Sequence, residues 1–264
     1  MAAKAGQSAL AALGIGLALA AADAKAQQQE PTGPRPASAC DVPVESLVLP
    51  APLPHVVAAL KQSKVLNILA IGSSSGAGRS FASRAKSYPA LLEALLEKAL
   101  AGIDVIIVNR PVSGEIVATA SERIKTEVAL SRPDLLIWQV GANDALAHIP
   151  PEDYEASLRQ GVLWAKENGV DVLLVGFEAN PWLNDDQEVN AIREATRRVA
   201  QTENVLYLRR FEAMQFVART RSKVEQGDNL YPADMGFDCM AEQVAQALAA
   251  NLVVRRVRPT TGEP

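Results

Sequence analysis

Glycine and serine predominate at residues 72–78, directly after the apolar run at residues 66–71. The apolar run has the composition of a buried parallel strand, and such a strand can deliver a reactive loop to the edge of a sheet. A serine at the end of a strand, beside the first turn of a helix, is placed to attack a carbonyl carbon. The segment therefore suggests nucleophilic chemistry, with a serine as the nucleophile.

The same loop could be a phosphate cradle, but its spacing argues against this. A Walker loop needs a lysine directly after its last glycine, whereas Gly78 is followed by Arg79. A dinucleotide-binding fingerprint that begins at Gly76 would need a glycine where Phe81 stands. The next apolar run ends in Asn109 rather than in an acid that could bind a ribose. Both kinds of phosphate site are therefore disfavoured.

Attack by a serine also requires hydrogen-bond donors for the oxyanion that forms. Candidate donors stand at residues 109–114 and 141–144, each after an apolar run of strand type. Because ligands bind at the carboxyl ends of parallel strands, we expect both segments to lie beside residues 72–78.

Strand-type and helix-type segments alternate regularly along the chain. This alternation predicts a single α/β domain, a three-layer αβα sandwich around a five-stranded parallel sheet. The predicted strands are residues 66–71, 105–108, 135–139, 172–175 and 205–208. The predicted helices are residues 53–63, 88–100, 115–130, 151–167, 186–202 and 234–251.

Over residues 66–251, these segments resemble the SGNH, or GDSL-type, hydrolases, which are flavodoxin-like α/β esterases, lipases and carbohydrate deacetylases. The first family block, usually Gly-Asp-Ser, falls on residues 72–74, the glycine of the second on Gly114, and the third, Gly-x-Asn-Asp, on residues 141–144. The resemblance implies that Ser74 is the nucleophile. It also implies an oxyanion hole made by the N–H groups of Ser74 and Gly114 and the side chain of Asn143. It implies neither a metal nor an organic cofactor.

The last family block departs from the usual pattern. It normally reads Asp-x-x-His-Pro, whereas here Asp228 is followed by Tyr231 in the histidine position and then by Pro232. An imidazole, with a pKa of about 6.5, accepts the serine proton near neutral pH. A phenol, with a pKa of about 10, is mostly protonated and accepts poorly. The identity of the base is therefore open.

The chain has two histidines that could replace the missing base. His148 follows the third block, in a loop that should border the site, so it is the better substitute base; the alternative is an exposed loop histidine. His55 precedes the first predicted strand, and we expect it at the opposite edge of the sheet. Asp228 could act alone on Ser74, although a carboxylate with a pKa of about 4 is a weak base.

Other residues near the predicted site have simpler interpretations. We expect Trp138 to pack in the core beneath the site. Trp182, after the fourth predicted strand, could line a substrate subsite or anchor a loop. Arg209 and Arg210, after the fifth strand, are expected at the surface.

The first 26 residues have the features of a signal peptide. Lys4 precedes an apolar stretch of 13 residues at 10–22, and residues 24–26 read Ala-Lys-Ala, a typical cleavage site. The alternative is an N-terminal helix of the mature fold. We expect cleavage near Ala26, a linker and N-terminal arm at residues 27–52, the domain at 53–253 and a disordered tail at 254–264. Such a protein would be periplasmic or secreted.

Cys40 and Cys239 are the two cysteines of the chain. An even number of cysteines in an exported protein predicts a disulfide, which would tie the N-terminal arm to the last helix. The alternatives are two unpaired thiols, or lipidation at Cys40, although Cys40 lies far beyond the apolar stretch.

The composition restricts the partners. The net charge is −4 and no stripe of lysine and arginine stands out, so nucleic acid is an unexpected partner. The 13-residue apolar stretch is too short for stable membrane insertion. The partner that we expect is an ester substrate, either a small molecule or a polysaccharide.

Two functions are compatible with these residues. The first is an exported serine ester hydrolase, an esterase or deacetylase, that uses Ser74 and the Ser74, Gly114 and Asn143 oxyanion hole. The second is a catalytically impaired SGNH-fold protein that binds carbohydrate or acyl groups in the cell envelope. Tyr231 is the main support for the second.

Overall fold

The strands of this protein form one central sheet. In the computed structural model, the described residues are 40–72, 88–178, 187–221 and 233–257. The strands are β1 (Val48–Leu49), β2 (Val65–Gly72), β3 (Asp104–Pro111), β4 (Leu135–Val140), β5 (Asp171–Gly176) and β6 (Leu206–Leu208). The helices are α1 (Val44–Leu47), α2 (Pro54–Gln62), α4 (Tyr88–Ala99), α5 (Val117–Ser131), α6 (Ala142–Leu146), α7 (Pro151–Glu167), α8 (Gln187–Thr202), α9 (Arg210–Arg221) and α10 (Ala233–Val257).

The strand order is β1-β6-β5-β4-β2-β3. Strands β2 to β6 pair in parallel and have the flavodoxin-like order, as the resemblance implied. The expected count of five strands is wrong, because β1 adds a sixth that runs antiparallel to β6. Strand β1 has only two residues, too few to show any periodicity in the sequence.

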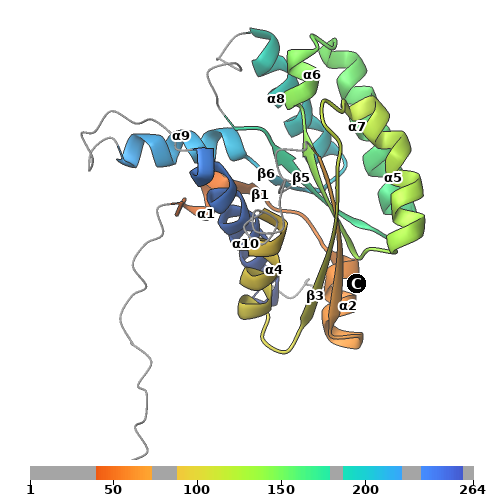
Figure 1. The fold of residues 1–264 in the computed structure, drawn as a ribbon, viewed down its shortest axis with the longest axis vertical. Helices are drawn as coiled ribbons and strands as arrows, with labels where there is room; N and C mark the ends of the chain where they lie inside the picture. Colours follow the sequence, from red (N-terminus) through yellow and green to blue (C-terminus); the bar gives the residue numbers. More distant parts are fainter. Residues whose placement is uncertain (1–39, 73–87, 179–186, 222–232, 258–264) are drawn as a thin grey trace, which may run out of the picture. The chain divides into compact units, whose positions relative to one another are not determined.

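Helices cover both faces of the sheet (Figure 1). Successive side chains of a strand point to opposite faces, so Ile68 and Ala70 pack toward α4 and α10, while Leu69 and Ile71 pack toward α5, α7 and α8. Trp138 is fully buried in the second layer, as expected. A Cβ on Gly161 of α7 would lie 2.8 Å from its ring, so this glycine allows the close approach of helix and sheet.

The order of the strands reverses at β2, which pairs with β3 on one side and with β4 on the other. The chain therefore leaves neighbouring strands toward opposite faces, which opens a crevice at their carboxyl ends. Gly72 ends β2 at this point, and a Cβ there would lie 2.6 Å from Cβ of Gln139. A side chain at residue 72 would therefore collide with β4.

The N-terminal arm is fastened to α10. Cys40 and Cys239 form a disulfide, which confirms the predicted pairing. Further along the arm, Asn251 Nδ2 donates to the Ala51 carbonyl at 2.9 Å and Asn251 Oδ1 accepts from the Ala51 N–H at 3.2 Å. The disulfide closes a sequence separation of 199 residues. In the chain-entropy model, closing so long a loop stabilises the fold by about 5 kcal/mol.

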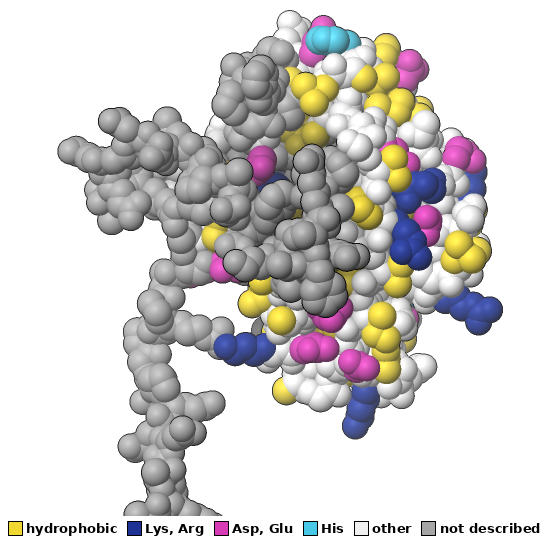
Figure 2. All heavy atoms as spheres, viewed as in Figure 1, with side chains coloured by type: hydrophobic (Ala, Val, Ile, Leu, Met, Phe, Trp, Pro, Cys, Tyr) yellow, Lys and Arg dark blue, Asp and Glu magenta, His cyan; other side chains and the backbone are white. Residues whose placement is uncertain are grey.

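Two further predictions concern the chain ends and the surface. The predicted leader lies outside the described residues, and α10 continues to Val257, beyond the expected end at residue 251. Among the described helices, none combines the length and apolarity that a bilayer crossing requires. Among the described residues on the face in Figure 2, lysine and arginine side chains lie dispersed between acidic and apolar ones.

Candidate active site

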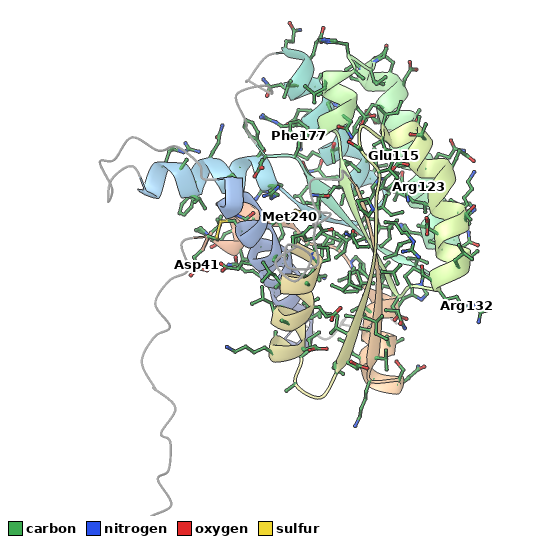
Figure 3. All side chains as sticks on the ribbon, viewed as in Figure 1. Asp41, Glu115, Arg123, Arg132, Phe177 and Met240 are labelled. Carbon is green, nitrogen blue, oxygen red and sulfur yellow. A yellow bond between two sulfur atoms is a disulfide. The ribbon has the colours of Figure 1, made fainter. Side chains whose placement is uncertain are left out.

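A cavity of about 300 Å³ lies at the carboxyl ends of β2, β4 and β5, where the strand order reverses. Its lining includes Gly72, Glu115, Gly141, Asn143, Phe177 and Arg210. In Figure 3, Glu115 and Phe177 lie toward the same end of the sheet, and Arg132, which precedes β4, lies toward the other. The cavity is therefore where the family resemblance places a site.

The third family block turns sharply from β4 into α6. Gly141 has a φ of +93°, and a Cβ there would lie 3.0 Å from the Phe177 ring. Glycine is needed for two reasons. A residue with a side chain would be strained at this φ, and the Phe177 ring leaves no room for a Cβ. The turn places Asn143 and Asp144 in the first residues of α6, beside the cavity.

Asn143 and Asp144 join the third block to the second. Asn143 Nδ2 donates to the Glu115 carbonyl at 2.8 Å, and Asp144 Oδ1 accepts from the Val117 N–H at 2.9 Å. Asp144 is buried, and this burial raises the pKa of its carboxyl, while hydrogen bonds from backbone N–H groups oppose the rise. The carboxylate thus holds the first N–H of α5 in place.

The second block is also joined to the first. The Val112 N–H donates to the Gly72 carbonyl at 2.9 Å, which extends the pairing of β2 and β3 by one residue. Gly114 follows in an exposed turn with a φ of +71°, where a Cβ would meet nothing within 4 Å. Conformation rather than space therefore favours glycine at residue 114.

Several predicted site residues lie outside the described residues. They are Ser74, Asp228 and Tyr231, together with Trp182. Of the first block, the structure describes Gly72, which lines the cavity.

The two histidines lie apart from the lining of the cavity. His148 has a side chain that is 77% exposed, and its Nδ1 lies 2.7 Å from Glu188 Oε2. His55 is exposed on α2, at the amino edge of the sheet where Asp171 begins β5, as expected.

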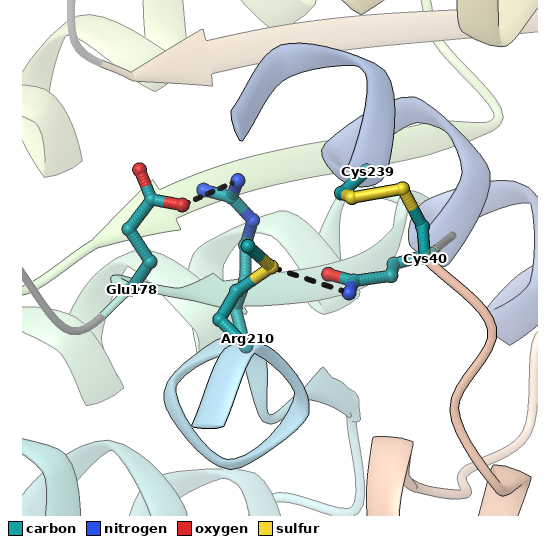
Figure 4. The surroundings of a disulfide bond; sticks show 6 residues. Cys40, Glu178, Arg210 and Cys239 are labelled. Atoms are coloured by element: carbon teal, nitrogen blue, oxygen red, sulfur yellow. Dashed lines mark hydrogen bonds and ion pairs between the residues drawn. A yellow bond between two sulfur atoms is a disulfide. The ribbon is translucent and has the colours of Figure 1, made fainter. Parts of the chain in front are cut away.

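Sequence reasoning missed an ion pair in the cavity wall. Arg210 Nη2 lies 2.8 Å from Glu178 Oε2, and the two side chains face each other near the Cys40–Cys239 disulfide (Figure 4). Arg210 is only 6% exposed, so its predicted surface position is wrong. Burial lowers the pKa of Arg210, and Glu178 opposes this effect. Both residues follow the carboxyl ends of adjacent strands, which is the signal that could have revealed them.

Comparison with known proteins supports the same family. The model of the non-GDSL lipase-like family matches residues 39–253. The chain is 27% identical over 186 residues to an arylesterase of Vibrio mimicus, covering 70% of this chain and 89% of the relative. It is 23% identical over 193 residues to an acetylxylan esterase of Geobacillus stearothermophilus, covering 67% of this chain and 81% of the relative.

The fold matches solved structures as well. The crystal structure of TesA has a TM-score of 0.54 at 25% identity, over 70% of this chain and 99% of that one. A catalytic mutant of Axe2, the acetylxylan esterase from Geobacillus stearothermophilus, has a TM-score of 0.58 at 21% identity, over 69% of this chain and 94% of that one.

Proposed function

We infer the function from the family: the chain belongs to the non-GDSL lipase-like family, which is of the SGNH type. The predicted resemblance is thereby confirmed. We propose that the protein is an exported carboxylic ester hydrolase with Ser74 as its nucleophile. The relatives are an arylesterase, esterase TesA and an acetylxylan esterase, and all three names describe hydrolysis of carboxylic esters.

One observation carries the proposal: hydrogen bonds link the three family blocks around one cavity. Val112 reaches Gly72, and Asn143 reaches Glu115 beside Gly114. In the proposed reaction, the Ser74 hydroxyl oxygen attacks the carbonyl carbon of the ester. The π electrons of the carbonyl move to its oxygen, which becomes the oxyanion. An asparagine amide has two N–H groups, so Asn143 can hold Glu115 with one and an oxyanion with the other.

The catalytic mutants of the Geobacillus acetylxylan esterase support the role of the last block. In that protein a serine, an aspartate and a histidine are replaced by alanine, and the aspartate precedes the histidine by three positions. Asp228 precedes Tyr231 by the same interval. We therefore propose that Asp228 and Tyr231 occupy the dyad positions, with the histidine replaced.

His148 is our candidate for the base that replaces the histidine, although its exposed side chain is not among the described residues that line the cavity. Its Nδ1 pairs with a carboxylate of Glu188, the arrangement that orients a histidine base in a triad. Nε2 would then accept the Ser74 proton and return it to the leaving alcohol. Loss of activity in His148→Gln would support this role, whereas full activity would leave Asp228 as the base.

Export is the second part of the proposal. The predicted leader at residues 1–26 suggests it, and a Cys40–Cys239 disulfide is favoured in an oxidising compartment such as the periplasm or the exterior. We propose small-molecule or polysaccharide esters as substrates.

Hydrolysis of p-nitrophenyl acetate tests the enzyme. We expect activity in the purified protein and a loss of several powers of ten in Ser74→Ala, since the nucleophile is removed. An inert protein that gains activity in Tyr231→His would contradict the proposal. The impaired, ligand-binding function would then be favoured.

A further inference from the structure

A half-buried ion pair adjoins the proposed oxyanion hole. Arg123, on α5, donates from Nε to Glu115 Oε1 at 2.7 Å and from Nη2 to Glu115 Oε2 at 2.5 Å. The exposed fractions of the two side chains are 22% for Arg123 and 7% for Glu115. Figure 3 shows the two residues close together. Two parallel bonds between a guanidinium and a carboxylate fix orientation as well as distance.

The same guanidinium also contacts the end of β3. Arg123 Nη2 donates to the Arg110 carbonyl at 3.2 Å, and Arg123 Nη1 lies 3.5 Å from Glu127, which in turn accepts from Arg110 Nε at 3.0 Å. Arg123 therefore binds both ends of the segment 110–115, which contains Gly114. This pair differs from the exposed ion pairs of the surface, which contribute little.

Glu115 is held from two directions. Its carboxylate binds Arg123, and its carbonyl accepts the amide of Asn143. A change in the Arg123 contact would therefore move the turn at Gly114 relative to Asn143. Misplacement of a catalytic group by about 1 Å can cost about 100-fold in rate.

We propose that Arg123 is a positioning residue, which holds the turn at Gly114 so that the Gly114 N–H and the Asn143 amide converge on one oxyanion. This inference rests on the proposed function. The hydrogen bond to Glu115 raises the pKa of Arg123, so the guanidinium stays charged throughout the accessible pH range.

The first test compares Arg123→Gln with Arg198→Gln in ester hydrolysis. Arg198 of α8 makes two hydrogen bonds to Glu155 of α7 and is not among the described residues that line the cavity. We expect Arg123→Gln to lower kcat about 10-fold with KM changed less than about twofold, because the oxyanion forms only after binding. Arg123→Lys should be intermediate, since an ammonium cannot reproduce the two-bond geometry. Arg198→Gln should match the unsubstituted protein.

The second test reads out the oxyanion itself. A thionoester places sulfur where the oxyanion hole expects oxygen, so the rate ratio of an oxygen ester to its thionoester reports the quality of the hole. We expect this ratio to fall in Arg123→Gln and to stay unchanged in Arg198→Gln. A merely structural loss would lower both rates equally, and that result would overturn the proposal.

Amide hydrogen exchange of the peptide spanning residues 110–116 separates this proposal from the proposed function. We expect exchange to be about 10-fold faster in Arg123→Gln than in Arg198→Gln, whether or not the protein hydrolyses esters. If the protein is inert but exchange is faster in Arg123→Gln, the proposed function is overturned, while the role of Arg123 in fixing the turn at Gly114 is supported. Unchanged exchange would overturn the positioning role.

Discussion

Asp144 lies at the carboxyl ends of the parallel strands, here called the carboxyl edge of the sheet, and Asp171 lies at their amino ends, the amino edge. Each aspartate accepts a hydrogen bond from an N–H at the start of a helix. Asp144 Oδ1 accepts from Val117 of α5 at 2.9 Å, and Asp171 Oδ2 accepts from Val56 of α2 at 2.9 Å. The aspartates are 2% and 6% exposed. Burial raises the pKa of both carboxyls, that of Asp171 to about 6.

The two helix starts differ in what lies beside them. The start of α5 follows the turn at Gly114 and Glu115, and Asp144 lines the cavity. The start of α2 includes His55, and Asp171, which binds it, interacts electrostatically with His55 and Asp134, away from the described lining of the cavity. A hydrogen bond from a helix start to a buried aspartate thus supports the proposed site at the carboxyl edge, whereas at the amino edge it supports packing alone. We expect substitutions at the first edge to change activity and those at the second to change stability.

The largest effect is expected for Asn143→Ala. Loss of one oxyanion donor should lower kcat by about 10²–10³-fold, with a small change in stability. Asn168 provides a matched control at the amino edge, because its Nδ2 also donates to a carbonyl, that of Trp164, at 2.8 Å. Steady-state hydrolysis of p-nitrophenyl acetate measures both. Equal losses in Asn143→Ala and Asn168→Ala would break the distinction between the edges.

Asp144→Asn and Asp171→Asn compare the two aspartates directly. An asparagine presents one acceptor and one donor, so in Asp144→Asn a backbone N–H loses its acceptor, at a cost of about 1–3 kcal/mol in the free energy of unfolding. We expect kcat of Asp144→Asn to fall about 10-fold as the start of α5 shifts, whereas Asp171→Asn keeps its kcat. Chemical denaturation and initial rates give the two quantities. A fall of kcat in Asp171→Asn would contradict the assignment of that edge to packing.

Asp171 should also make stability depend on pH. Its folded-state pKa is raised from 3.8 to about 6, so the folded state binds this proton more tightly than the unfolded state does. The stability contribution is therefore fully present below about pH 4 and is lost as pH rises through about 6, with a total of about 1–3 kcal/mol. Denaturation curves between pH 4 and 7.5 should show this slope, and Asp171→Asn should have a shallower one, to which Asp144 with its raised pKa still contributes. A variant that retains the full slope would assign it to another group.

The sequence predicted the periodic elements best. Helix α7 has the predicted bounds, and the five parallel strands appear where apolar runs alternate with amphipathic segments. Strand β1 and helices α1 and α6 were missed, since two, four and five residues are too short to show a period. Helix α9 was missed as well, although it has 12 residues.

For the site, residue type and spacing predicted that the blocks containing Gly114 and Asn143 follow strand ends, and the structure places Asn143 in the lining of the cavity. The partners of these residues were not predictable. Arg123 reaches Glu115 across a separation of eight residues, and neither helix nor strand geometry brings two side chains so far apart into contact. The sequence suggested a surface position for Arg210, because its ion-pair partner Glu178 follows a different strand and their pairing cannot be read from spacing along the chain.

The smallest expected effect distinguishes the two histidines. His55 lies next to Asp171, and its positive charge lowers the pKa of that carboxyl. Removing the charge in His55→Gln should therefore raise the pKa of Asp171 slightly, because His55 is exposed to solvent and its charge is screened. NMR titration of the Asp171 carboxyl carbon measures the shift. His148→Gln is the matched control at the carboxyl edge, where His148 pairs with Glu188 instead, and it should leave this pKa unchanged. A lower pKa in His55→Gln would contradict the effect assigned to His55, whereas an equal rise in His148→Gln would show that the two edges are electrostatically coupled.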